Sequence, residues 1–358
     1  MDHTHSSKSA MKYSKPAITA LLMLAASDFT HAATTCVGAE LYSRSTVKYG
    51  RWEIRMKVAA TPGSVSSFFT YNNNSYLGAP HPWREIDIEV LGKNTGSFQS
   101  NLITGNAASK VTSESLHGLP GLADGFHTFE LDWTPDSIVW RLDGKVRRKT
   151  ESNDQQVVDL RDSSQTWRMN LWASSSVAWV GAFDLNKLPV AQVVNWMRYS
   201  RYTPGAGPNK SNFTFEWLDD FDRLDKTRWS LGDWTFDENL AQFDPANGIT
   251  KDGYLALLLT KPGQEGVFNN MPADPDGNKY PTSSIQEPVM GLRSFRAAAV
   301  DGGFRLEGLE GMTEVRSTSG KMIWRGMADA KGQALIPSAH AGVVMVRSGA
   351  ATGSLVLR

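Results

Sequence analysis

The chain has 358 residues, enough for one large domain with a sizeable core and a smaller module besides. Its 37 basic and 37 acidic residues cancel to a formal net charge of zero, so charge gives no argument for nucleic acid or an anionic membrane as a partner. The 12 tryptophans are the unusual feature of the composition. Aromatic residues suit a β-rich core, and they also suit sugar binding, because pyranose rings stack on indole; composition alone leaves both interpretations open.

The N-terminus has the pattern of a secretory signal. Two lysines follow Met11, an apolar run covers residues 17–26, and the small pair Ala32-Ala33 offers a cleavage site. The run is too short to span a bilayer as a helix. We therefore expect residues 1–33 to be a signal peptide, translation to begin at Met11, and the mature chain to be extracellular or on the cell surface.

The single cysteine, Cys36, cannot form an internal disulfide. The fold must therefore be stable outside the cell without one. No His or Asp signature accompanies this thiol, so we expect it to have no catalytic role.

Residues 40–202 have a sequence pattern typical of β-structure throughout. Short runs alternate apolar and polar side chains, and Gly, Asn, Asp and Pro separate them. One such run places Trp52, Ile54, Met56 and Val58 on a single face. Many short strands with frequent turns predict an all-β fold, an antiparallel β-sandwich of the jelly-roll type.

The most informative run is residues 85–90, in which acids alternate with isoleucine or valine. Glu85, Asp87 and Glu89 share one face of the expected strand, and the apolar residues share the other. The apolar face demands a core, so the three acids must line the opposite, solvated face. Like charges on one face raise one another's pKa, which a purely structural strand would avoid.

The spacing of the two glutamates suits one chemistry. The Cα atoms of Glu85 and Glu89 should lie roughly 13 Å apart, and side chains that lean inward can bring the carboxyls to roughly 5–6 Å. That separation fits retaining glycoside hydrolysis, in which one carboxylate attacks and the other protonates the leaving oxygen. Asp87 between them would help to keep the acid protonated. An acidic surface patch or a metal site remain the alternatives on pattern alone.

The segment 85–89, Glu-Ile-Asp-Ile-Glu, resembles the catalytic signature of family 16 glycoside hydrolases. Residues 65–71 and Gly92-Lys93-Asn94 resemble the lichenases of that family, the 1,3-1,4-β-D-glucan 4-glucanohydrolases, and the similarity extends from about Gly38 to Thr260. The resemblance implies a secreted, monomeric licheninase that cleaves mixed-linkage β-glucan such as lichenan and needs no organic cofactor. It makes Glu85 the nucleophile, Glu89 the acid/base and Asp87 the assisting residue.

The order of segments resembles a naturally circularly permuted lichenase. The stretch 215–221, Phe-Glu-Trp-Leu-Asp-Asp-Phe, and the later Trp229 and Trp234 follow the acidic strand here, whereas they precede it in most lichenases. Permutation is tolerated where the original termini lie close together at the surface. The Pro/Gly-rich connection 203–209 would then join the ancestral termini.

The resemblance also implies binding residues. The expected glucan-binding residues are Glu40, Phe69, Tyr71, Trp83, Gln99, Asn101, Asn170, Trp172, Trp179, Trp234 and Phe236. Trp196 and Trp229 are expected in the core instead. A structural Ca²⁺ held largely by backbone oxygens would lie at Asn195, Asp220 and Gly253. Leu240 stands where the permuted enzyme has a basic residue, which puts a hydrogen bond at an outer subsite in doubt.

The rest of the chain divides by composition. Residues 34–261 form the expected catalytic domain, 262–290 a Pro-, Asn- and Gly-rich linker, and 291–358 a small C-terminal β module. The run 342–347 resembles C-terminal sorting domains of Bacteroidetes-like secretion systems; a carbohydrate-binding or structural appendage is the alternative.

Two rival functions share this fold. A laminarinase-type β-1,3-glucanase commonly has one more residue between Asp and the second Glu, which this chain lacks. A non-catalytic lectin would keep the aromatic residues but has no need of two glutamates four residues apart beside an aspartate.

Overall fold

The computed structural model describes residues 35–276, 296–300, 303–309, 312–317, 322–337, 342–348 and 351–357. The expected signal peptide and the second part of the expected linker, residues 277–290, lie outside these ranges. Within them the chain is mainly antiparallel β-structure, and no helix has the length and hydropathy that a membrane crossing requires. The short helices are η1 (Ser75–Leu77), α1 (Gln155–Asp159), α2 (Val177–Val180), η2 (Leu185–Lys187), η3 (Pro208–Lys210) and η4 (Pro245–Asn247).

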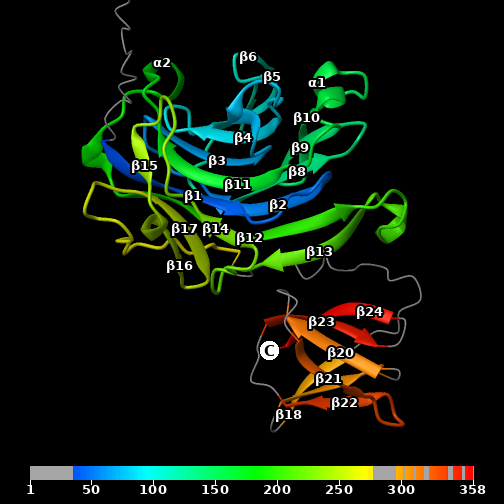
Figure 1. Ribbon diagram of the computed structural model, residues 1–358. Helices are drawn as coiled ribbons and strands as arrows, with labels where there is room; N and C mark the ends of the chain where they lie inside the picture. The colour runs from blue at the N-terminus through cyan, green and yellow to red at the C-terminus, as the bar shows by residue number, and fades with distance from the viewer. Residues whose placement is uncertain are drawn as a thin grey trace, which may run out of the picture. The chain divides into compact units, whose positions relative to one another are not determined.

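The first sheet has nine strands and carries the acidic strand, β4, beside β3 and β5 (Figure 1). Its path is β14–β1–β11–β3–β4–β5–β6, with β15 paired to β1 and β7 to β5. All pairings are antiparallel except that of β1 with β15. The bounds are β1 (Cys36–Ser43), β3 (Ser64–Tyr71), β4 (Glu85–Leu91), β5 (Ser97–Asn106), β6 (Ser109–Thr112), β7 (Ser115–Gly118), β11 (Thr166–Ala173), β14 (Trp229–Leu231) and β15 (Ala241–Phe243).

The second sheet has eight antiparallel strands. Its path is β10–β9–β8–β2–β12–β17–β16, with β13 also paired to β12. The bounds are β2 (Gly50–Lys57), β8 (His127–Trp133), β9 (Ile138–Leu142), β10 (Lys145–Lys149), β12 (Val190–Tyr202), β13 (Phe213–Asp219), β16 (Gly248–Lys251) and β17 (Tyr254–Leu259).

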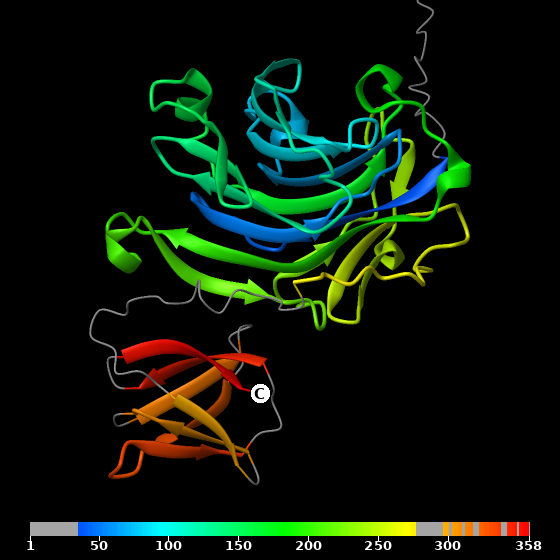
Figure 2. The same cartoon turned by 180° about the vertical axis from the view of Figure 1, so that it is seen from behind.

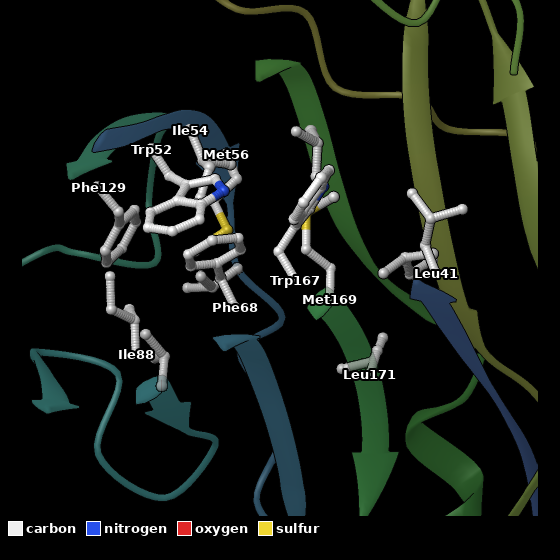
Figure 3. Packing of buried hydrophobic residues seen from close by; sticks show 14 of the residues in the cluster. Leu41, Trp52, Ile54, Met56, Phe68, Ile88, Phe129, Trp167, Met169 and Leu171 are labelled. Atoms are coloured by element: carbon white, nitrogen blue, oxygen red, sulfur yellow. The ribbon is translucent and has the colours of Figure 1, made fainter. Parts of the chain in front are cut away.

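Apolar side chains from both sheets pack between them and make the core of a jelly-roll β-sandwich, as the alternation predicted. Trp52 of β2 and Phe68 of β3 lie 6.3 Å apart between ring centroids, and both are fully buried (Figure 3). The expected inward face of β2 and its continuation at Val58 is at most 3% exposed. The inward residues of the acidic strand are fully buried in the same cluster: Ile86, Ile88 and Val90. Burial of this face holds β4 in register and turns its acids away from the core.

Two Gly-containing connections join neighbouring strands of the second sheet. Asp143 and Gly144 connect β9 to β10 with φ of 50° and 72°, the left-handed conformation that a two-residue hairpin requires. The connection 203–209 belongs to the hairpin loop between β12 and β13, which the amide of Thr203 closes by donating to the Asn212 carbonyl at 2.8 Å (Figure 2). That this loop joins ancestral termini stays a prediction.

Residues 261–276 differ from the free linker that we expected. They contain no strand, but the Arg55 guanidinium donates two hydrogen bonds of 2.7 Å to the Asp274 carboxylate, which is fully buried. Asn195 of β12 donates a third, at 2.8 Å. Phe268 and Met271 also pack against a buried cluster of the sandwich that includes Phe126 and Val193. Composition missed this attachment because the segment has few large apolar residues, and a buried ion pair supplements them.

The described C-terminal residues form two small sheets around their own core, which includes Phe304, Leu306 and Val315. One sheet has the order β18–β19–β22 and the other β21–β20–β23–β24. The bounds are β18 (Arg296–Val300), β19 (Gly303–Glu307), β20 (Met312–Ser317), β21 (Met322–Met327), β22 (Gln333–Ile336), β23 (Gly342–Ser348) and β24 (Ala351–Leu357).

The expected core residues outside the main alternation are buried. Trp229 is 1% exposed within the main core, and Trp196 is 4% exposed in a separate cluster with Leu218 and Phe215. Cys36 is also buried, and its thiol donates a long hydrogen bond to the Leu240 carbonyl. Burial raises the pKa of this thiol to about 12, which keeps it protonated and unreactive at neutral pH.

Candidate active site

Three rows of side chains cross the face of the first sheet that points away from the core. Strand β4 supplies the central member of each row, and β3 and β5 supply its neighbours. The rows are Tyr71–Glu85–Ile103, Phe69–Asp87–Asn101 and Ser67–Glu89–Gln99. Strands β11 and β1 extend two of them, with Arg168 beside Phe69, Asn170 beside Ser67, Tyr42 beside Arg168 and Glu40 beside Asn170. Antiparallel pairing thus gathers residues from five strands around the three acids.

Glu85 has a hydrogen-bond donor and positive charges near its carboxyl. The indole N–H of Trp83 donates to its Oε2 atom at 2.6 Å. Burial is the largest influence and raises the pKa of Glu85 above its ordinary value, whereas the Trp83 hydrogen bond, the charge of Lys110, the Asp87 side chain and the charge of Arg168 act in the opposite direction. The half-buried carboxyl therefore has a donor and two cations that favour its ionised form.

Glu89 has the opposite surroundings. Within the described chain no hydrogen bond or ion pair reaches its carboxyl, and the charges that act on it are those of Glu85 and Glu114. Burial first, and then these two negative charges, raise the pKa of Glu89 to about 8. At neutral pH Glu89 therefore carries a proton that it can donate.

Asp87 lies between the two glutamates and is 3% exposed. Burial, followed by the charges of Glu85 and Glu89, raises its pKa well above the ordinary value. Its backbone carbonyl accepts a hydrogen bond of 2.9 Å from the indole of Trp140 in the opposite sheet. This bond ties the middle of the acidic strand to the core.

A polar network continues the face beyond β3. Arg168 forms an ion pair with Glu40, which is 3% exposed, and also donates to Asn73 Oδ1 at 2.8 Å. Asn170 donates to Glu40 at 3.2 Å and accepts from the Ser67 hydroxyl at 2.5 Å. Side chains fixed in this way present a prearranged set of donors and acceptors, which suits a ligand rich in hydroxyl groups.

Aromatic residues flank both sides of this polar strip. Trp172 is 8% exposed and lies against Trp179 at 5.9 Å and Phe236 at 4.9 Å between ring centroids. The Trp179 indole also donates a long hydrogen bond to Gln99. Trp234 lies 5.2 Å from the ring of Tyr42. Among the aromatic residues of the predicted set, Trp172 is the most enclosed, and Phe236, at 37% exposed, is the most open to stacking.

Sequence reasoning missed several members of this site. They are Tyr42, Ser67, Asn73, Lys110, Glu114 and Arg168. Arg168 and Tyr42 could have been found from the alternation in their own strands, since each shares a face with an expected binding residue two positions away. Lys110 and Glu114 come from short, exposed segments without any signal; only the pairing of β5 with β6 and β7 brings them near the acids.

The calcium site expected at Asn195, Asp220 and Gly253 stays a prediction. β12 pairs with β17 up to Val194 and with β13 from Met197, so Asn195 lies between the two pairings, while Gly253 directly precedes β17 and Asp220 directly follows β13. Asn195 Oδ1 is buried and accepts no hydrogen bond from the described residues. An orphaned oxygen beside strand-end carbonyls fits a hard cation, although no cluster of three acidic, His or Cys side chains is placed for a metal in the described chain.

Leu240 stands at the position where the sequence resemblance would place a basic residue. Its side chain is partly buried and packs against the main core, and its carbonyl accepts hydrogen bonds from the amides of Thr35 and Cys36. The residue thus has a structural role at the start of β1, and the loss of a hydrogen bond at an outer subsite stays a prediction.

Comparison with known proteins agrees with this geometry. Residues 4–197 match the model of a family described as glycosyl hydrolases family 16. A β-glucanase of Fibrobacter succinogenes is 47% identical over 268 residues, which cover 75% of this chain and 74% of that protein. A β-glucanase of Bacillus subtilis is 36% identical over 160 residues, which cover 44% of this chain and 61% of that protein. Among solved structures, the Bacillus licheniformis β-glucanase is similar with 33% identity and a TM-score of 0.38, over 45% of this chain and 70% of its own.

Proposed function

The chain belongs to family 16 of the glycosyl hydrolases, and from this premise we propose that it is an endo-acting, retaining β-glucanase specific for mixed-linkage β-glucan. It would cleave β-1,4 linkages that adjoin β-1,3 linkages. The observation that carries the proposal is the contrast between the surroundings of two glutamates on one strand face. The Trp83 hydrogen bond and the charges of Lys110 and Arg168 favour the ionised form of Glu85 against its burial, whereas burial and two negative charges all favour the protonated form of Glu89. Two carboxyl groups with opposed protonation are what double displacement needs.

The reaction follows from these two states. Glu85 attacks the anomeric carbon and forms a covalent glycosyl-enzyme, while Glu89 gives its proton to the departing glucosyl oxygen. Glu89, now ionised, then takes a proton from water as this water attacks the anomeric carbon. The attack breaks the bond to Glu85 and restores the original configuration of the anomeric carbon. Asp87 lies between the two groups, and because its own pKa is raised well above the ordinary value it can donate a proton in a hydrogen bond to Glu85, which favours the ionised form of the nucleophile.

The regularity of β4 supports mixed-linkage glucan over laminarin. The strand pairs residue by residue with β3 from Glu85 to Leu91 and with β5 from Glu85 to Glu89, without a register shift on either side. A laminarinase-type strand with an additional residue between Asp87 and Glu89 would have to bulge. The uncharged polar residues Gln99 and Asn101 beside these acids also suit a neutral polysaccharide.

The test is the release of reducing ends from barley β-glucan, with laminarin and carboxymethylcellulose as parallel substrates. We expect activity on β-glucan alone. The variant Glu85→Gln should lose at least roughly a thousandfold in kcat while it keeps its fold and its affinity for glucan. Glu151→Gln, at an exposed glutamate outside the site, is the matched control and should behave as wild type.

Each other outcome has a definite meaning. Activity mainly on laminarin would retain the carboxylates and overturn the substrate. Turnover in Glu85→Gln close to that of wild type would remove Glu85 from the nucleophile role. Binding of glucan without cleavage of any of the three substrates would favour the lectin.

We also propose that the chain is exported as a monomer and that a structural Ca²⁺ binds beside Asn195. The signal pattern of residues 1–33 supports export, and N-terminal sequencing of protein from the culture medium should find a start just after Ala32 or Ala33. A start at Met1 or Met11 in the secreted protein would contradict cleavage.

A further inference from the structure

Lys110 lies where an exposed residue of the short strand β6 can reach the acidic strand. The backbone amide of Trp83 donates to the carbonyl of Gly105 at 2.8 Å, and Gly105 in turn is the register partner of Lys110. Trp83, Gly105 and Lys110 thus form a row across three adjacent segments. Because the middle residue has no side chain, Lys110 can extend over it towards the indole.

The contacts in this row form a chain that ends at a reacting group. The Lys110 ammonium lies 3.6 Å from the centroid of the Trp83 ring. The same ring donates its N–H to Glu85 Oε2 at 2.6 Å. Tyr71 holds the indole from another side, with its ring 5.7 Å away and nearly perpendicular. The indole is therefore fixed in position between a cation and the carboxylate.

A cation on the face of an indole draws electron density towards itself and leaves the N–H edge more positive. An indole polarised in this way is a stronger donor to an anion. One face of Trp83 is also covered by Lys110, so this tryptophan differs from a free stacking platform for sugar.

We propose that Lys110 is a positioning residue that acts through Trp83: its ammonium group polarises the indole and thereby strengthens the hydrogen bond that keeps Glu85 ionised and correctly oriented for attack. The inference rests on the nucleophile role proposed above for Glu85. It assigns Lys110 to the reaction although the residue touches neither substrate nor the reacting atoms.

Other charges act on Glu85 as well, and the experiment must separate them from Lys110. The titratable and charged groups that influence this carboxyl from neighbouring positions are Asp87 and Glu89 of β4, Tyr71 of β3 and Arg168 of β11. None of these changes when Lys110 is replaced, so a comparison of variants at position 110 isolates its contribution. The direction is fixed: positive charge at Lys110 lowers the pKa of Glu85.

The first experiment compares Lys110→Met, Lys110→Arg and the control Lys145→Met in the full chain. Lys145 is an exposed lysine of β10, so its replacement changes the net charge equally. For Lys110→Met we expect the acid limb of the kcat/KM profile on β-glucan to move to higher pH, with roughly a threefold loss on the acid side of the optimum. Lys110→Arg should restore the wild-type limb, and Lys145→Met should leave it in place. A uniform loss at all pH values, or no shift, would overturn the proposal.

The second experiment does not depend on turnover. The pKa of Glu85 is measured by ¹³C NMR of the carboxyl groups, assigned with Glu85→Gln, and should be higher in Lys110→Met than in wild type. If the protein hydrolysed none of the glucans but this pKa rose, the proposed function would fail and the influence of Lys110 on Glu85 would stand. The increase should be smaller in a Trp83→Phe background, because phenylalanine has no N–H to polarise. An equal increase in both backgrounds would overturn the role of the indole.

Discussion

Raising the pH through 8 should switch off hydrolysis by removing the proton from Glu89. Burial, together with the negative charges of Glu85 and Glu114, raises the pKa of Glu89 to about 8. A raised pKa means that the protonated, catalytically competent form is present at lower pH and is lost as the pH rises through that value. The basic limb of kcat/KM should therefore lie near pH 8, because this limb reports the essential acid of the free enzyme.

The magnitude follows from the occupancy of a single proton. With a pKa of about 8, about nine-tenths of Glu89 is protonated at pH 7 and about one-tenth at pH 9. The value of kcat/KM should fall about tenfold between pH 7 and pH 9 and about tenfold again for the next unit. An ordinary exposed glutamate would already have lost its proton below pH 6.

The assay is the initial rate on barley β-glucan at concentrations well below KM, from pH 4 to pH 10, after stability has been checked at each pH. The variant Glu114→Gln removes an exposed negative charge that raises the pKa of Glu89, so its basic limb should move to lower pH. Glu151→Gln controls for the change in net charge. A basic limb near the ordinary glutamate range, or a limb that Glu114→Gln moves upwards, would refute this assignment of the acid.

Three further predictions concern the parts of the structure that support the site. Trp140→Phe removes the indole hydrogen bond to the Asp87 carbonyl and should cost roughly 1 kcal/mol in urea unfolding, with a fall in kcat; unchanged values for both would contradict the tie between the sheets. Asp274→Ala leaves the Arg55 guanidinium without its buried partner and should cost roughly 3 kcal/mol, whereas a neutral effect would mean that residues 261–276 are a free linker. Removal of Ca²⁺ with a chelator should lower the Tm of the wild type but not that of Asn195→Ala, and an equal effect on both would exclude this site.

The local pattern of the sequence predicted the fold because the alternation of apolar residues in each strand identifies its buried face. The alternation in β2 and β4 identified the inward residues correctly, since a shift of one residue would expose every one of them. The same logic placed Phe69 and Tyr71 beside the acidic strand and put Gln99 and Asn101 on one face of the next. These residues lie next to the acids because neighbouring strands in the chain are also neighbours in the sheet.

The rest depends on pairings between distant segments, which no local pattern contains. Arg168 belongs to a strand nearly a hundred residues beyond β3, and only the register of β11 sets it beside Phe69. Asp274 lies 219 residues from Arg55, and neither residue carries a sign of the ion pair in its own surroundings in the sequence. Lys110 could have been found only by knowing that Gly105 separates it from Trp83. Cross-strand contacts of this kind require the topology first.

The division of labour between Glu85 and Glu89 also arises from the sheet rather than from the strand that carries both. Within the strand the two glutamates have the same chemistry, the same orientation and the same neighbour, Asp87, so the only local difference between them is Trp83, two residues before Glu85. The difference comes from side chains outside β4. The Glu85 carboxyl has the Trp83 donor and the charge of Lys110, whereas the Glu89 carboxyl has only negative charges near it. If this asymmetry sets the roles of the two glutamates, removing the charge beside either of them should shift the pKa of that glutamate. Lys110→Met should make the nucleophile harder to ionise, Glu114→Gln should make the acid harder to keep protonated, and the double variant should narrow the pH range of activity from both sides.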